Sequence, residues 1–503
     1  MSTTQTTNPG RWMALTVLAA GLSLIVLDGT IVGVALPTMI SALHLTLTDA
    51  QWVNAIYNVI FAALLLGSGR LGDRIGRRTT FIAGVVLFVA GSLLAATATG
   101  AGSLIASRAV QGVGGALVLP ATLSSVNSLF HGKDRAAAFG VWGAVMSGMA
   151  ALGPLLGGVL TEYASWRWIF WVNLPLGLLV IVGILAWVPQ THGKQNSRGV
   201  DVDGLLTSAI GFGLVVFGLI EASTLGWWEK KATLHLGPWE WPASWGISPV
   251  PFAIGIGLIF ICLFLRWELH RARNGRDALL DLNLFKVGTF SWGNLTAATV
   301  AIGEFSLMFV LPLFLVNSMG LSTLTTGFVL AGMALGAFAS GASARHLAAR
   351  LTAPGVVVLG LALEVMGVAL LAWVVAVQTS IWLVVATLVV YGVGLGLASA
   401  QLTSTVRQLG SAFGAAIAGS ALGVAMSHTI PATGVPAELA QATESSAGSA
   451  ITALRETAEA SAEVIRSLEA GFAQSAAWSI GFSALFLVLG LVGSFMVLRA
   501  SRR

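Results

Sequence analysis

Charged residues are scarce in this chain. Asp, Glu, Lys and Arg make up 9% of its 503 residues, whereas 56% are apolar. Soluble proteins carry about 25% charged residues, so the composition places the chain in a lipid bilayer. The net charge of +5 belongs to loops beside membrane spans, and it therefore does not indicate a nucleic-acid partner.

Cysteine and the usual motifs of catalysis are also scarce or missing. The single cysteine, Cys262, lies in an apolar run, which excludes a disulfide framework and argues against a thiolate metal site. The seven histidines show no metal-ligand spacing. A Gly-x4-Gly-Lys-Ser/Thr motif is missing, so ATP is not the direct energy source. We expect a protein that is not an enzyme and that uses no metal or cofactor.

Long apolar runs, in contrast, are abundant. A helix needs about 20 apolar residues to cross the hydrocarbon core of a bilayer. The first run is too long for a signal-peptide core and has no evident cleavage site, so we expect a retained helix. The runs number about fourteen, and they lie near 12–37, 50–69, 79–98, 102–126, 135–160, 167–188, 204–222, 249–270, 287–316, 322–344, 354–376, 380–402, 406–428 and 472–498. The sequence thus predicts an all-α membrane protein.

The positions of Lys and Arg predict the orientation of these helices, because cytoplasmic loops carry an excess of both residues. With the N-terminus inside, most of the Lys and Arg residues fall in inside loops and at the C-terminus. The outside segments hold only Arg167, Lys230, Lys231, Arg455 and Arg466. We therefore expect a multi-pass protein of the cytoplasmic membrane with both termini in the cytoplasm.

The order of the runs predicts three parts. Residues 1–190 and 286–503 each hold six spans, and residues 191–285 hold two inserted spans. Repeated halves are typical of transporters, whose binding sites lie where the halves meet. The Trp-rich outer segment 223–248 favours an interfacial belt, with a ligand-gathering lip as the alternative. The outer loop 429–471 has helical composition, and we expect it to form a solvated helix or hairpin.

One charged stretch stands out between the second and third runs. It reads Gly69-Arg70-Leu71-Gly72-Asp73-Arg74-Ile75-Gly76-Arg77-Arg78. Glycine permits a sharp turn, so a plain cytoplasmic hairpin is one interpretation. The pattern also resembles the loop signature between helices 2 and 3 of major facilitator superfamily transporters. The resemblance implies a cytoplasmic gate in which Asp73 meets the start of the helix at 406–428, and its residues would be Gly69, Asp73, Arg74, Gly76, Arg77 and Arg78.

Asp28 lies well inside the first run, in the phrase Leu27-Asp28-Gly29-Thr30-Ile31-Val32-Gly33-Val34-Ala35-Leu36-Pro37. A carboxylate there is costly unless it is paired, hydrated or protonated, which makes it a candidate functional group. An acid locked in a structural ion pair is the alternative. The phrase resembles a helix-1 signature of multidrug exporters with fourteen helices, although those usually have Asn where this chain has Gly33. We expect Asp28 to serve proton coupling and substrate binding.

Arg108 is the basic residue deep in the fourth run, which continues to Gln111 and Gly114. A guanidinium stays charged, so it needs an anion or many acceptors nearby. The phrase resembles the helix-4 motif of proton-coupled facilitators, in which the arginine is implicated in proton transfer. A purely structural arginine is the alternative. We include Gln111 among the expected substrate-binding residues.

Glycines cluster in the fifth run. Small residues let helices pack closely in lipid, and packing alone could explain them. The spacing also resembles the antiporter motif that distinguishes exporters from importers of the superfamily. The matching residues are Gly148, Gly153, Pro154, Gly157 and Gly158.

Further phrases extend the resemblance to the fourteen-helix branch over nearly the whole chain. They are Trp166-Arg167-Trp168-Ile169-Phe170-x2-Asn173-Leu174-Pro175-x-Gly177, Asp201-x2-Gly204 and Leu279-Leu280-Asp281-Leu282-x-Leu284-Phe285, together with Trp52 and Tyr57 as substrate-binding candidates. In the second half, Glu304 and Glu364 lie among apolar residues near mid-membrane. In the family, acids in this half serve proton coupling or bind drug cations.

The resemblance implies a drug:proton antiporter that acts by alternating access between two six-helix bundles. Its partners would be protons, the lipid bilayer and a small amphipathic or cationic drug-like substrate, and it would act as a monomer. Export of a lipid or an endogenous metabolite is an alternative within transport. A membrane sensor with a transporter-like fold is an alternative outside it.

Overall fold

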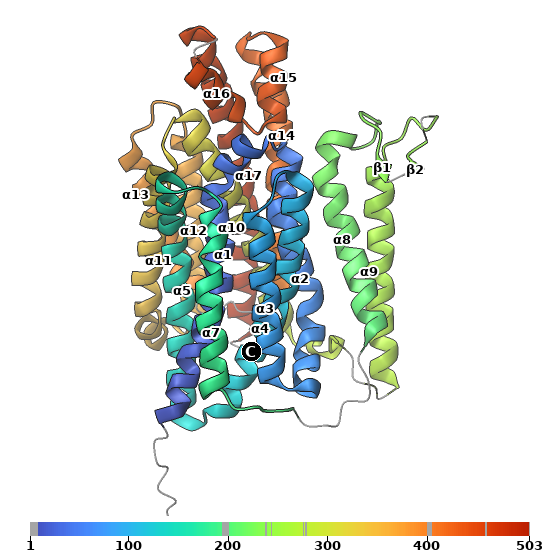
Figure 1. Cartoon of the computed structure of the whole chain (residues 1–503), viewed down its shortest axis with the longest axis vertical. Coiled ribbons are helices and arrows are strands. Elements are labelled where there is room, and N and C mark those ends of the chain that lie inside the picture. The colour runs from blue at the N-terminus through green and yellow to red at the C-terminus, as the bar shows by residue number, and fades with distance from the viewer. Residues whose placement is uncertain are drawn as a thin grey trace, which may run out of the picture.

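The computed structural model describes residues 9–193, 201–236, 239–242, 244–274, 276, 279–399, 405–457 and 460–501. Helices run side by side through most of this part of the chain (Figure 1). In chain order they are α1 (Pro9–Leu43), α2 (Leu47–Ile75), α3 (Arg77–Ala96), α4 (Ala101–Leu129), α5 (Gly132–Tyr163), α6 (Trp168–Trp171), α7 (Asn173–Trp187), α8 (Val202–Leu225), α9 (Pro249–Arg273), α10 (Gly288–Leu313), α11 (Thr323–Leu351), α12 (Ala353–Val374), α13 (Ile381–Ser399), α14 (Thr405–Thr429), α15 (Ala437–Ser445), α16 (Ser449–Thr457) and α17 (Ala462–Ala500).

Shorter elements complete the chain. They are the strands β1 (His235–Leu236) and β2 (Trp239–Glu240), which pair antiparallel, and the helical turns η1 (Leu282–Lys286), η2 (Phe314–Ser318) and η3 (Pro431–Thr433). The prediction of an all-α membrane protein is confirmed, because 12 helices of the described residues are long and apolar enough to cross a membrane. The bent pair Leu47–Leu65 and Gly67–Ile75 makes a thirteenth. The total of fourteen stays a prediction.

Polar side chains fix where helices begin. At the start of α2, Asp49 N donates to Thr46 Oγ1 over 3.1 Å, and Thr46 N donates to Asp49 Oδ2 over 2.9 Å. This reciprocal capping box satisfies backbone groups that the first turn leaves free. Ser248 caps α9 in a similar way, with Pro249 in the first turn, where a missing N–H costs nothing.

The charged stretch differs from its expected form. α2 continues to Ile75 and α3 begins at Arg77, so Gly76 is the single residue between two helices. The prediction of a loop over 69–78 was therefore wrong. Gly76 has φ 104°, a conformation that favours glycine, and a Cβ atom there would overlap the amide of Gln190.

The helices form two halves and an inserted pair. We call α1–α7 the first half and α10–α17 the second half. They meet where α5 packs on α11 and where α2 packs on α14. The inserted pair α8 and α9 stands to one side, with α8 against both α2 and α14 (Figure 1).

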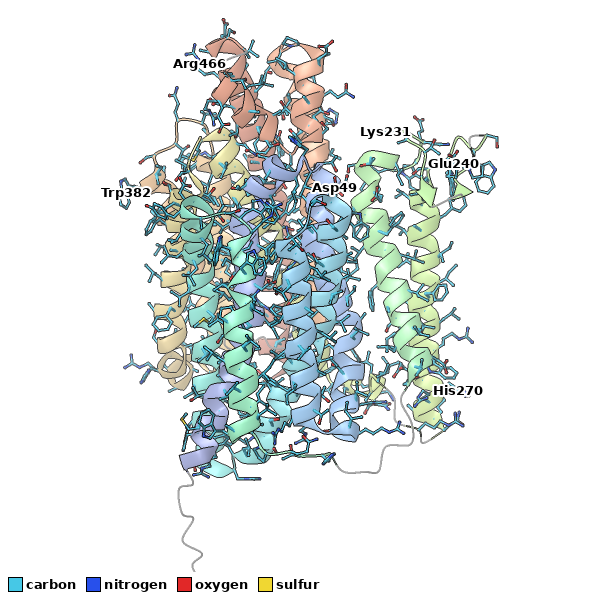
Figure 2. The ribbon with its side chains drawn as sticks, viewed as in Figure 1. Asp49, Lys231, Glu240, His270, Trp382 and Arg466 are labelled. Carbon is cyan, nitrogen blue, oxygen red and sulfur yellow. The ribbon has the colours of Figure 1, made fainter. Side chains whose placement is uncertain are left out.

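The two ends of the molecule are distinct. α15 and α16 lie at one end, here called the cap end, whereas α1 begins and α17 finishes at the opposite, terminal end (Figure 1). Figure 2 shows Asp49, Lys231, Glu240 and Arg466 toward the cap end, with His270 at the terminal end. Trp382 and Trp373 are 79% and 83% exposed, as expected for aromatic residues at a membrane interface.

The segment 429–471 forms more structure than a solvated hairpin. Ala447, Ile451 and Leu468 are fully buried in its inner face. Asn317 Nδ2 in η2 donates to Ala447 O over 3.0 Å. Arg455 in α16 donates to Asn317 O over 3.0 Å and to Glu469 Oε1 in α17 over 2.6 Å. We call α15 and α16 the cap, and these contacts fasten the cap to η2 and α17.

The cap should therefore contribute to stability. Replacing Ile451 by Ala leaves a cavity in its inner face, and such changes cost about 2–5 kcal/mol. We expect a melting temperature in detergent several degrees below that of the unsubstituted protein. Glu456→Ala, at an exposed position of the same helix, is the control and should leave it unchanged. Equal melting temperatures for the two variants would contradict this packing.

Candidate functional site

Asp28 and Arg108 meet inside the first half. Asp28 projects from α1 and Arg108 from α4, and their side chains form an ion pair between Nη1 and Oδ2. Both residues are 1% exposed. Arg108 Nε also donates to Val53 O in α2 over 3.3 Å, and its guanidinium lies 4.5 Å from the ring centroid of Tyr57. The pair therefore joins α1, α2 and α4.

Amide side chains complete this cluster. Gln111 Oε1 accepts from Arg108 Nη1 over 2.7 Å, and Gln111 Nε2 donates to Asp28 Oδ1 over 2.9 Å. Asn173 Nδ2, at the start of α7, donates to Asp28 Oδ1 over 3.3 Å. Both amides also donate to Ser92 Oγ in α3, over 2.8 and 3.1 Å. Buried charges are tolerated where hydrogen bonds satisfy them in this way.

This arrangement matches the ion-pair interpretation of Asp28 in the conformation described. The sequence assigned Asp28 and Arg108 to proton coupling and Asp28, Gln111 and Tyr57 to substrate binding. The structure brings these four side chains together. It adds Asn173 and Ser92. Asn173 could have been identified from the sequence, because it is a polar residue within the family-like phrase at 166–177. Nothing in the sequence sets Ser92 apart from other serines.

The second half holds a second ion pair. Glu304 in α10 faces Arg407 in α14, with 2.5 Å between Oε2 and Nη2 and 3.4 Å between Oε1 and Nη1. The count of inside-loop charges included Arg407, although it falls within the predicted run at 406–428. The structure places Arg407 in α14, which begins at Thr405. The paired geometry uses both arms of the guanidinium, which suits a carboxylate.

Glu364 is different from the other buried acids. It lies in α12, is fully buried, and neither of its carboxylate oxygens has a hydrogen-bond partner among the described residues. It interacts electrostatically with Glu304 and Arg407. Gly394 of α13 packs so closely that a Cβ atom there would lie 2.9 Å from Glu364 Cγ. Glu304 and Glu364 thus belong to one buried group in the second half.

Trp52 forms its side-chain hydrogen bond with the inserted pair and not with either buried cluster. Its Nε1 donates to Glu221 Oε1 in α8 over 2.8 Å, and its ring lies 6.1 Å from that of Phe217. Trp52 therefore faces the inserted pair in the conformation described. Its role in substrate binding stays a prediction.

The charged stretch is tied to the first half. Asp73 Oδ1 accepts from Arg77 Nη2 over 2.9 Å, and Arg77 Nη1 donates to Ser124 O over 2.9 Å. Arg78 donates to Leu185 O over 3.1 Å. The expected partner of Asp73 is the start of the helix at 406–428. Residues 400–404, which precede this helix, lie outside the described residues, and the contact stays a prediction. The gate residues Gly69 and Arg74 lie on the last turns of α2.

The glycine motif lies at the contact between helices. A Cβ atom at Gly153 would overlap Thr30 of α1, and one at Gly158 would lie 2.9 Å from Thr323 O of α11. A Cβ atom at Gly327 of α11 would lie 2.6 Å from Pro154 O. Side chains at these positions would push α5 away from α1 and α11. Gly157 likewise faces Ile31, whereas Gly148 has open space beside it.

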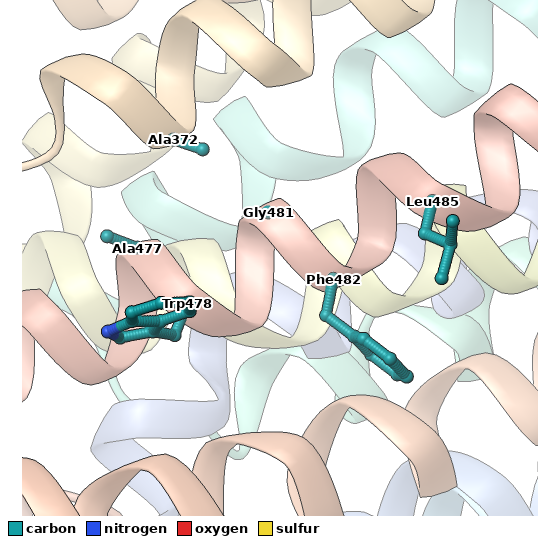
Figure 3. Close-up of a pocket in the computed structure, with 6 residues that line it drawn as sticks. All are labelled: Ala372, Ala477, Trp478, Gly481, Phe482 and Leu485. Carbon is teal, nitrogen blue, oxygen red and sulfur yellow. The ribbon is translucent and has the colours of Figure 1, made fainter.

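Two cavities in the described part of the chain are lined mainly by apolar side chains. One of about 560 Å³ lies between α12 and α17 and is lined by Ala372, Ala477, Trp478, Gly481, Phe482 and Leu485 (Figure 3). Trp478 is 66% exposed, so this groove faces outward toward the surrounding lipid. Among the described residues, no group of three or more His, Cys, Asp or Glu side chains could hold a metal ion.

Comparisons with known proteins agree with this architecture. A family model described as the Major Facilitator Superfamily matches residues 18–428. The puromycin resistance protein of Streptomyces alboniger is 32% identical over 449 residues, which cover 86% of this chain and 84% of that protein. The methylenomycin A resistance protein of Bacillus subtilis is 30% identical over 410 residues, covering 81% and 83%.

A solved structure shares the fold at lower identity. It is a bacterial homolog of the human lysosomal transporter Spinster, in an inward-facing and occupied conformation. It aligns with a TM-score of 0.62 at 17% identity and covers 98% of both chains.

The Asp28–Arg108 pair makes a testable prediction. Arg108→Ala leaves a buried carboxylate without its partner, and breaking such a pair costs about 3–5 kcal/mol. We expect a large loss of melting temperature in detergent. Arg108→Lys should lose less, because it keeps the charge but not the planar fork. In the control Asp28→Leu/Arg108→Leu, both charges are removed and much of the stability should return. A stable Arg108→Ala variant would contradict the proposed contribution of the pair.

Proposed function

Because the chain belongs to the major facilitator superfamily, we propose that it exports drug-like compounds across the cell membrane in exchange for protons. Relatives that match most of the chain are named for resistance to puromycin and methylenomycin A. Others are named multidrug resistance proteins. These names support a drug-like compound as substrate. Its small size and its amphipathic or cationic character are part of the proposal.

The observation that carries the proton coupling is the unpartnered carboxylate of Glu364. Asp28, Glu304 and Glu364 are buried acids, and Arg108 and Arg407 are the bases paired with the first two. Glu364, in contrast, forms no hydrogen bond with any described residue. An ionised carboxylate without hydrogen bonds is costly in an apolar interior. Glu364 can avoid that cost by holding a proton or by meeting a cationic substrate.

Alternating access would link this site to both sides of the membrane. The two halves meet along α5–α11 and α2–α14, and rocking along these contacts would open one end while closing the other. At the cap end, Thr38 Oγ1 lies 3.0 Å from Thr323 Oγ1, and Leu324 N donates to Glu162 Oε2 over 3.4 Å. These contacts join the halves at the end that we propose faces outward.

In the proposed cycle, a proton enters from outside and binds Asp28 or an acid of the second half. Protonation weakens the hold on a cationic drug and favours its release outward. Return of the empty carrier delivers the proton to the cytoplasm. α1 begins and α17 finishes at the terminal end (Figure 1), which supports an even number of spans and both termini in the cytoplasm.

Glu364→Gln tests the coupling. The amide keeps the shape of the side chain but cannot exchange a proton. In proteoliposomes, we expect drug uptake driven by an imposed pH gradient to fall at least about tenfold, the effect of about 1.4 kcal/mol, while drug counterflow without a gradient persists. Glu463→Gln, at an exposed acid of α17, is the control. Gradient-driven transport at the unsubstituted rate would remove Glu364 from the mechanism.

Asp73→Asn tests the cytoplasmic gate. If Asp73 latches the terminal end shut in the outward-open state, neutralising it should favour the conformation that is open to the cytoplasm. A loss of about 1.4 kcal/mol would shift the ratio of states tenfold. Turnover should fall more than drug affinity. Labelling of single cysteines at the two ends, in a Cys262→Ser background, measures the shift. Asp203→Asn, at an exposed acid of α8, is the control, and equal labelling of the two variants would refute the latch.

A further inference from the structure

Gln51 forms an unusual contact between the two halves. It lies in the second turn of α2, and its side chain is fully buried. Its Nε2 donates to Ala416 O of α14 over 2.9 Å. A Cβ atom at Gly419 would overlap the amide of Gln51. The absence of a side chain at Gly419 therefore creates a notch in α14 that the glutamine of the other half occupies.

The chemistry of this contact suits an interaction that breaks and re-forms. Gln51 Oε1 is buried and has no hydrogen-bond partner in the described part of the chain. A buried amide that leaves one polar atom unsatisfied is a poor choice for permanent packing. If α2 and α14 separate, water can reach both the amide and Ala416 O, so the net gain from the contact is small.

Neighbouring contacts place Gln51 at a seam covered by α8. On the first half, Thr48 Oγ1 lies 2.7 Å from Thr224 Oγ1. On the second half, Ser420 Oγ donates to Leu219 O over 2.5 Å. One helical turn after Gln51, Ala55 of α2 packs against Ala412 and Ala415 of α14. We call this α2–α14 contact, from Thr48 to Ala55, the outer seam.

We propose that Gln51 is the gate residue of the outer seam: its amide in the Gly419 notch holds α2 and α14 together at the cap end, and opening to the outside requires the amide to withdraw. The inference rests on the alternating access proposed above. It adds which side chain controls the opening of the cap end, and it makes Gly419 part of the same device.

The test measures accessibility, with no drug and no gradient present. Single cysteines replace Ala55 in the outer seam or Thr323 in α11 in a Cys262→Ser background, and a bulky polar maleimide labels them in detergent. Both positions are buried here, at 0% and 9% exposure. Because no transport is measured, a failure of the drug:proton proposal would leave these labelling results interpretable.

Gln51→Met keeps much of the side-chain volume but removes the donor. We expect it to raise the labelling rate at both reporters by roughly two- to tenfold, as expected for the loss of one hydrogen bond. Gly419→Ala should raise both rates further, because the added methyl expels the amide. Labelling at both positions marks opening of the whole cap end. A rise confined to position 55 would mean local loosening and would overturn the gate role.

The combined variant supplies the decisive comparison. In Gln51→Ala/Gly419→Ala, the shortened side chain no longer meets the methyl, so labelling should fall below that of Gly419→Ala alone. Gly423→Ala is the matched control, because a Cβ atom there would lie 3.3 Å from Leu47 Cδ2 and 3.6 Å from Ser223 Cβ. It should stay within twofold of the unsubstituted rate. Unchanged labelling in Gln51→Met, or multiplied effects in the combined variant, would overturn the proposal.

Discussion

The cost of placing charge in an apolar interior governs how each half is built. Asp28 and Arg108 are tolerated because α1, α2, α3, α4 and α7 all contribute to one network of donors and acceptors around them. Removing a single partner leaves another group unsatisfied, so the network fixes the relative positions of five helices. The second half solves the same problem less completely, since Glu304 has Arg407 but Glu364 has no hydrogen bond in the described residues. We infer that the first half is the more rigid scaffold and that the second half changes more when a proton or a substrate binds.

Glycine determines where the two halves approach each other. At the α5–α11 contact, Gly158 and Gly327 bring backbone against backbone. At the α2–α14 contact, Gly419 instead receives a side chain. Two smooth helix surfaces can slide or roll, whereas a side chain in a notch must leave before movement begins. The two contacts should therefore resist rocking in different ways.

The sequence predicted the membrane class and nearly every helix, because apolar length is a local feature. It singled out Asp28, Arg108, Gln111 and Tyr57 as candidates but did not predict that they form one cluster. It did not predict the partner of Glu304, since Arg407 lies 103 residues away and looks like an ordinary loop arginine. The extent of α2 was also missed, because glycines and charges that favour a turn were overridden by packing against α4 and α3. Ser92 and Gln51 could not be singled out, as their importance arises only from which helix faces them.

The chain that follows α7 is bound to the junction of α2 and α3. Arg77 N donates to Thr191 O over 2.9 Å, and Gly193 N donates to Asp73 O over 3.0 Å. α8 is also bound to α2 by Thr224 and Glu221. α2 is thus bound to α8 near its start and to the segment after α7 near its end. We expect the inserted pair to move together with the first half. If the pair moves with the first half, rocking must separate α8 from α14 and break the hydrogen bond from Ser420 Oγ to Leu219 O. The inserted pair then enlarges one bundle and is not a hinge between two.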